Sequence, residues 1–155
     1  MTSAISARFS ALRMSQKKAL IVYLTAGFPD MHTTKSLCEE CRDIGVDCIE
    51  LGVPFSDPIA DGVVIQQASH RALESGTTLS GILNLCAEMG AKLDIPLLLM
   101  GYYNPFYQRG FARLAQECAS ANIAGLIVPD LPFEESRPLK KHLSRLLKIK
   151  VFAVF

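Results

Sequence analysis

Short apolar segments alternate with amphipathic helical segments along almost the whole chain. Apolar runs of strand length occupy residues 18–25, 46–52, 95–102, 123–128 and 148–155. The segments between them repeat apolar residues every three or four positions, as on one face of a helix. Strands that are nearly continuously apolar and separated by helices form a parallel sheet that helices cover. The sequence therefore predicts an α/β fold with about five parallel strands.

The helical segments are recognised by apolar residues that recur at one-turn spacing. Their apolar positions are Ile5, Phe9 and Leu12; Leu37, Cys41 and Ile44; Val64, Ala68 and Ala72; Leu79, Ile82, Leu85 and Met89; Phe111, Leu114 and Cys118; and Leu139, Leu143 and Leu146. The first of these segments has no acidic residue and superficially resembles a transit peptide. Its periodicity favours an amphipathic helix that covers another part of the molecule.

The length of the chain, 155 residues of which half are hydrophobic, is enough for one buried core, so residues 1–155 are predicted to form a single domain. Two architectures fit: an open doubly wound sheet, and part of an eight-stranded barrel, which typically needs about 250 residues. Length alone favours the open sheet. A net charge of +1 without a basic cluster argues against a nucleic-acid partner, and no glycine-rich nucleotide motif is present.

The cysteines form an odd set of five that lie mostly in apolar patterns: Cys38, Cys41, Cys48, Cys86 and Cys118. Free thiols in such positions behave as small hydrophobic residues and favour a reducing, cytoplasmic setting. Cys38 and Cys41 have C-x-x-C spacing, but the further ligands that a zinc site requires are missing, so no metal site is predicted. No run approaches the roughly 18 apolar residues of a membrane span.

A rigid acidic loop follows the second predicted strand, in the segment "ELGVPFSDPIADG" (residues 50–62). On an alternating strand Cys48 and Glu50 share one face, whereas Ile49 and Leu51 share the other and suit the helix layer. Glu50 then points to the interior at the carboxyl end of its strand, where α/β proteins place their active sites. Burial raises the pKa of a carboxyl group, so Glu50 is a candidate acid and base near neutral pH.

A second carboxylate, Asp61, ends the same loop, which Pro54 and Pro58 stiffen. The loop can return Asp61 to the pocket of Glu50, and two carboxylates in different environments form a usable acid and base pair. Structural roles compete with this interpretation. Asp61 also suits the N-cap of the next helix, Asp57 suits a turn or an interface, and Glu50 has the alternative of a buried ion pair. For Asp61 the two alternatives stay open.

The acidic segment strongly resembles the signature of the tryptophan synthase alpha subunit family. Four further blocks resemble that family in the same order: "YLTAGFPD" (23–30), "IQQASHRAL" (65–73), "MGYYNPF" (100–106) and "VPDLPFEES" (128–136). The resemblance implies a (β/α)8 TIM barrel, of which these residues form an N-terminal part with an N-terminal helix and about five parallel strands. The resemblance therefore favours part of a barrel over the open doubly wound sheet that length alone favours. It also implies that the last three strands, the mobile lid and the glycine-rich phosphate site of the family are not among these residues.

The resemblance implies a lyase of tryptophan biosynthesis without a metal or organic cofactor. Members cleave indole-3-glycerol phosphate to indole and glyceraldehyde 3-phosphate in a retro-aldol step, and indole then passes to a beta subunit. Glu50 matches the general acid and base of the family, and Asp61 matches the partner of the indole nitrogen. The alternative is a non-catalytic fragment that retains only surface facing the beta subunit.

The resemblance also implies two further sets of residues. The expected walls of the indole pocket are Tyr23, Met100, Tyr102 and Ile127. The residues expected to face the beta subunit are Pro54, Asp57 and Pro58 in one loop and Asn104 and Pro105 in another. Tyr23 stands where the family often has phenylalanine, and its hydroxyl is expected to add a hydrogen bond to the pocket.

Overall fold

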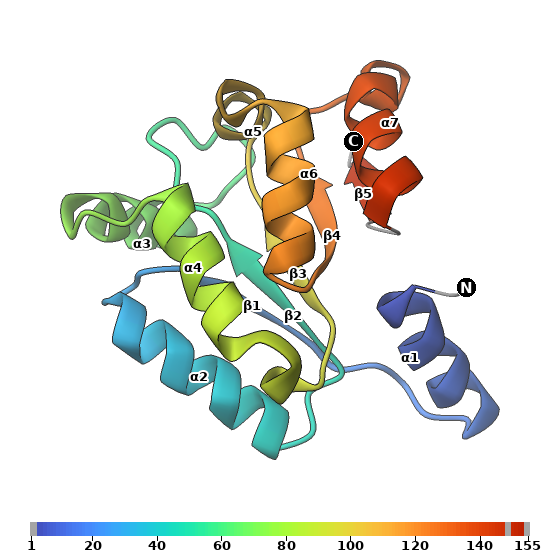
Figure 1. Ribbon diagram of the computed structural model, residues 1–155. Helices are drawn as coiled ribbons and strands as arrows, with labels where there is room; N and C mark the ends of the chain where they lie inside the picture. The colour runs from blue at the N-terminus through green and yellow to red at the C-terminus, as the bar shows by residue number, and fades with distance from the viewer. Residues whose placement is uncertain (1–2, 148–149, 154–155) are drawn as a thin grey trace.

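The computed structural model describes residues 3–147 and 150–153, which contain a parallel sheet of five strands in the order β1-β2-β3-β4-β5 (Figure 1). The strands are β1 (Ile21–Thr25), β2 (Cys48–Gly52), β3 (Leu97–Met100), β4 (Ile123–Val128) and β5 (Lys150–Ala153). Each strand pairs with the next one along the chain. A doubly wound sheet reverses its strand order at a switch point. The sheet has no reversal, so the architecture preferred from length alone is wrong.

The helices that connect successive strands cover one face of the sheet (Figure 1). They are α2 (Met31–Asp43), α3 (Val63–Glu74), α4 (Leu79–Met89), α5 (Tyr103–Arg109), α6 (Phe111–Ser120) and α7 (Arg137–Leu147), with short 3₁₀ turns at Gly90–Leu93 and Glu134–Ser136. A further helix, α1 (Ala4–Met14), precedes β1. The predicted alternation of strands and helices is confirmed. In the described part of the chain, no helix combines the length and the apolar character that crossing a bilayer requires.

The strand and helix boundaries differ from the predicted ones in two ways. Ladder pairing begins two or three residues after the start of the first three predicted apolar runs, and the fourth run, 123–128, coincides with β4. The fifth run, 148–155, includes four positions outside the described residues. Asn104 and Pro105 were expected in a loop, but they lie in the first turn of α5. Proline is tolerated there because first-turn amides have no partner within the helix.

The two faces of the sheet bury different sets of side chains. Ile49 and Leu51 have no exposed surface and belong to the main core, which lies between the sheet and the helix layer. Cys48 and Leu98 point to the opposite face, where they pack with Ile5 of α1. The two-residue alternation predicted for β2 is therefore confirmed, and it directs Glu50 away from the helix layer.

An ion pair fixes α1 beside the amino-terminal ends of the strands (Figure 1). The Arg8 guanidinium contacts the Asp47 carboxylate at 2.7 and 3.0 Å, and the other oxygen of Asp47 accepts a hydrogen bond of 2.8 Å from the Leu20 amide. Asp47 immediately precedes β2 and Leu20 immediately precedes β1. The first helix therefore lies at the end of the sheet opposite to the loops that carry the candidate chemistry.

Candidate active site

Glu50 lies in the middle of β2, in register with Tyr23 of β1 and Leu98 of β3. Its side chain is half-buried, and this burial raises the pKa of its carboxyl group. Among residues 3–147 and 150–153 no side chain pairs with the Glu50 carboxylate. The buried ion pair considered as an alternative is therefore not found in the described part, and Glu50 has the environment of a proton donor and acceptor.

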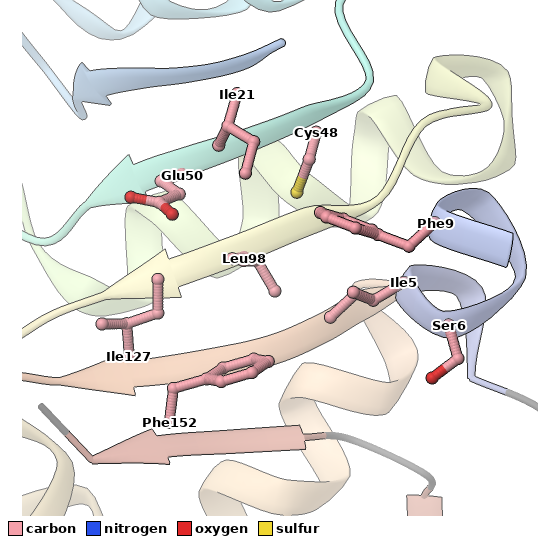
Figure 2. Close-up of a pocket in the computed structure, with 9 residues that line it drawn as sticks. All are labelled: Ile5, Ser6, Phe9, Ile21, Cys48, Glu50, Leu98, Ile127 and Phe152. Atoms are coloured by element: carbon pink, nitrogen blue, oxygen red, sulfur yellow. The ribbon is translucent and has the colours of Figure 1, made fainter. Parts of the chain in front are cut away.

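A cavity of about 340 Å³ lies between the sheet and α1, with Glu50 on its wall (Figure 2). Its lining consists of Ile5, Ser6, Phe9, Ile21, Cys48, Glu50, Leu98, Ile127 and Phe152. The Glu50 carboxylate lies nearer to the arrowheads of the strands, whereas Ile5, Ser6 and Phe9 extend from α1 at the other end. Burial raises the pKa of the Cys48 thiol to about 11, so this group is neutral. The cavity is an apolar space with one carboxylate among its described lining residues.

Asp61 lies in the loop between β2 and α3 and is bound to Tyr102, the second residue after β3. The Tyr102 hydroxyl donates a hydrogen bond of 3.1 Å to Asp61 Oδ2 and accepts one of 2.8 Å from the Ala60 amide. The N-cap of α3 is Gly62, which supplies no side-chain cap. The N-cap alternative for Asp61 is therefore wrong, because its carboxylate turns toward Tyr102 instead of the amides of the helix.

Tyr23 lies over the main chain of Gly52 at the same end of the sheet. A Cβ atom placed on Gly52 would lie 2.1 Å from the Tyr23 hydroxyl oxygen, so the tyrosine occupies this position because residue 52 has no side chain. Burial is the main cause that raises the pKa of Tyr23; the neighbouring charges of Asp61 and Glu50 raise it further, and a hydrogen bond with Thr25 lowers it. Tyr23 therefore lies within electrostatic reach of both candidate carboxylates.

Met100 and Ile127 occupy adjacent register positions near the carboxyl ends of β3 and β4. Met100 also pairs in register with Gly52, which links this position to Tyr23. Ile127 lines the same cavity as Glu50, and its role as a wall of an indole pocket stays a prediction. Tyr102 is placed differently from a simple pocket wall, because it is almost fully buried and its hydroxyl binds the Asp61 loop.

The residues expected to face a partner subunit differ in their exposure. Asp57 and Asn104 are exposed, and Pro58 and Pro105 are half-buried. Pro54 is buried, so within this chain it shapes the loop and presents little surface. In the described residues no three or more His, Cys, Asp or Glu side chains are grouped so as to hold a metal ion.

Two contacts of this region were not predicted from the sequence. Asp130, just after β4, accepts a hydrogen bond of 2.8 Å from the Tyr103 amide at the start of α5. The Gln66 side chain donates one of 2.9 Å to the main-chain oxygen of Asp61. The position of Asp130 after a parallel strand was a usable signal, since such positions converge at one edge of the sheet. For Gln66 no local signal exists.

The pH dependence of stability is expected to report the desolvation of Glu50. Because the folded-state pKa is raised above the ordinary value of 4.5, the folded protein binds this proton more readily than the unfolded protein does. The stability that the protonated group provides is complete below pH 4.5 and is lost as the pH rises through the raised pKa. Glu50→Gln should therefore melt at a higher temperature than the unsubstituted chain at pH 7, and the difference should vanish below pH 4.5.

The matched control for this measurement is Glu39→Gln, because Glu39 is exposed on α2. Thermal melting is followed by circular dichroism at several pH values. The melting temperature of this control should change with pH in nearly the same way as that of the unsubstituted chain. A melting temperature of Glu50→Gln equal to or below that of the unsubstituted chain across the whole range would contradict the desolvation argument.

Comparison with known proteins identifies the family of the chain. The family model described as "Tryptophan synthase alpha chain" matches residues 9–153. The tryptophan synthase alpha chain of Acaryochloris marina is 50% identical over 139 residues, which cover 90% of this chain and 52% of that protein. The corresponding protein of Citrifermentans bemidjiense is 49% identical over 138 residues, covering 89% of this chain and 52% of that protein.

Solved structures agree with the sequence relatives. The tryptophan synthase subunit alpha of Legionella pneumophila superposes with a TM-score of 0.89 at 37% identity, covering 94% of this chain and 56% of that one. An aminoacrylate-bound tryptophan synthase from M. tuberculosis gives a TM-score of 0.92 at 30% identity, covering 98% and 61%. The chain spans about half the length of the curated relatives it matches. The family match, the sequence identities and the partial TIM barrel together show that the chain belongs to the tryptophan synthase alpha chain family.

Proposed function

We propose that the complete protein that contains this chain is a lyase that cleaves indole-3-glycerol phosphate to indole and glyceraldehyde 3-phosphate. The observation that carries the proposal is the half-buried Glu50 carboxyl group with a raised pKa, on the wall of an apolar cavity in a member of this family. Asp61, held nearby by Tyr102, is the second carboxylate that the reaction requires.

The two carboxyl groups take complementary parts in a retro-aldol cleavage. Glu50 protonates carbon 3 of the indole and then removes the proton of the hydroxyl group on the adjacent glycerol carbon. The bond between these two carbons breaks, its electron pair returns to the ring, and the hydroxyl carbon becomes an aldehyde. Asp61 accepts a hydrogen bond from the ring N–H and stabilises the positive charge that develops there. The apolar cavity supports this role, because a dry environment strengthens both interactions.

A beta subunit and a reducing, cytoplasmic setting belong to the same proposal. The exposed Asp57 and Asn104 lie in two segments that Tyr102 connects, so one partner surface can contact both. The solved structure from Legionella pneumophila is described as tryptophan synthase subunit alpha, and the word subunit supports an assembly with a further chain. All five cysteines are free and buried, as expected where disulfides do not form.

A second candidate function follows from the length of the chain relative to its relatives. Because the chain spans about half of those proteins, the 155 residues alone are a candidate for a non-catalytic piece that retains the surface facing the beta subunit.

One experiment separates the two functions. The complete protein and the 155-residue chain are each incubated with indole-3-glycerol phosphate and, separately, with an immobilised beta subunit of the family. We expect indole release from the complete protein without added metal. Release by the short chain at a comparable rate would contradict the second candidate, and no release by a folded complete protein with its beta subunit would contradict the first.

A further inference from the structure

We propose that Tyr102 is a positioning residue whose hydroxyl group holds the Asp61 carboxylate and the adjoining Ala60 main chain in one arrangement. The inference rests on the proposed function, because it assigns Asp61 its place beside the indole nitrogen. It changes the role of Tyr102 from a wall of the pocket to a group that acts on substrate through Asp61.

The direction of both hydrogen bonds is determined by the chemistry of their partners. The Ala60 amide can only donate, so at 2.8 Å the Tyr102 oxygen must accept from it. The phenolic hydrogen is then free to point at Asp61 Oδ2, 3.1 Å away, and a carboxylate oxygen accepts such a bond. One hydroxyl group therefore binds the main chain of one residue and the side chain of the next.

Tyr102 is the rigid part of this arrangement. Its side chain is 3% exposed, and its ring stacks on Phe55 with centroids 5.1 Å apart. The preceding residue, Gly101, donates its amide hydrogen bond of 2.9 Å to the Ile127 carbonyl of β4. A Cβ on Gly101 would lie 2.8 Å from the Phe106 ring, so the chain approaches its neighbours closely just before Tyr102. The tyrosine is thus anchored to the sheet from which it extends.

The Asp61 loop is less constrained. Ala60 is exposed, and the Gln66 side chain connects this end of the loop to α3 through the main-chain oxygens of Pro58 and Asp61. The Asp61 amide adds a bond of 3.4 Å to the Pro58 carbonyl within the loop itself. In the described residues only the Tyr102 hydroxyl joins the Asp61 side chain to the end of β3. A carboxylate on such a loop loses its position if this bond is removed, and a displacement of about 1 Å can cost about 10²-fold in rate.

The first test measures the hydrogen bond without reference to activity. Amide hydrogen exchange is followed by NMR in the complete protein carrying Tyr102→Phe, which keeps the ring and removes the hydroxyl. Ala60 should exchange about 5-fold faster or more, since the loss of one hydrogen bond shifts an opening equilibrium by that order. The control Tyr103→Phe removes the hydroxyl group of the adjacent tyrosine and should leave Ala60 unchanged. Unchanged exchange at Ala60 in Tyr102→Phe would overturn the proposal.

The second test asks whether Tyr102 acts through Asp61. In the complete protein Tyr102→Phe should lower kcat for indole-3-glycerol phosphate cleavage by about 10- to 100-fold, with a smaller change in KM. In an Asp61→Asn background the same substitution should cause little further loss. Equal fold-losses in both backgrounds would overturn the coupling. If the unsubstituted protein releases no indole, the proposed function fails by itself, and exchange at Ala60 still decides whether Tyr102 holds the loop.

Discussion

Substitution of glutamine for Glu50 in the complete protein is expected to lower kcat for indole-3-glycerol phosphate cleavage by about 10²- to 10⁴-fold. The amide has nearly the same size as the carboxyl group but neither donates nor accepts the proton that the reaction transfers. Since Glu50 lines an apolar cavity and has no side-chain partner in the described residues, no second group there can replace it. KM should change little, because the lost interaction belongs to the transition state. The measurement is steady-state release of indole.

The matched control is Glu39→Gln, an exposed change of the same chemistry on α2. Calorimetric titration with an unreactive substrate analogue should show that Glu50→Gln still binds it. Turnover of Glu50→Gln within a few-fold of the unsubstituted protein would refute the assignment of Glu50 as general acid and base.

The 155-residue chain by itself is expected to self-associate. In the described residues β1 and β5 form the two edges of the sheet, and parallel edges with free backbone groups pair readily with another chain. The face opposite the helix layer also exposes apolar side chains: Phe9 is 40%, Ile21 43% and Phe152 38% accessible. A second copy whose edge strands pair with β1 and β5 of the first would extend the sheet toward a closed, barrel-like dimer. Light scattering should therefore give a mass of at least twice 17.0 kDa.

Ile21→Lys tests which surface is responsible, because it places a charge on the β1 edge and on the apolar face. It should shift the mass toward that of the monomer. The control Ile44→Lys changes an isoleucine that is 71% exposed at the end of α2 and should leave association unchanged. A monomeric unsubstituted chain with a sharp thermal transition would contradict the edge argument.

The local pattern of the sequence was sufficient to predict the strands, most helices and the direction of Glu50. A period of two residues divides β2 into one face of Ile49 and Leu51 and another of Cys48 and Glu50, whatever the rest of the molecule does. The same local rules missed α5, because Asn104 and Pro105 are typical of loops as well as of a first helical turn. The doubly wound sheet suggested by length was wrong, since length does not encode strand order.

Only the tertiary structure decided which group the Asp61 side chain contacts and how α1 is held. Asp61 suits an N-cap by sequence, but its carboxylate binds Tyr102, which lies 41 positions away, and Arg8 reaches Asp47 across 39 positions. Neither contact produces a repeating pattern in the sequence, because each depends on where two distant segments meet after the strands have paired. Periodicity therefore determined which face of the sheet each side chain occupies. The partner of each polar group was decided by the packing of distant segments, since a hydrogen bond forms only where both groups arrive within about 3 Å of each other.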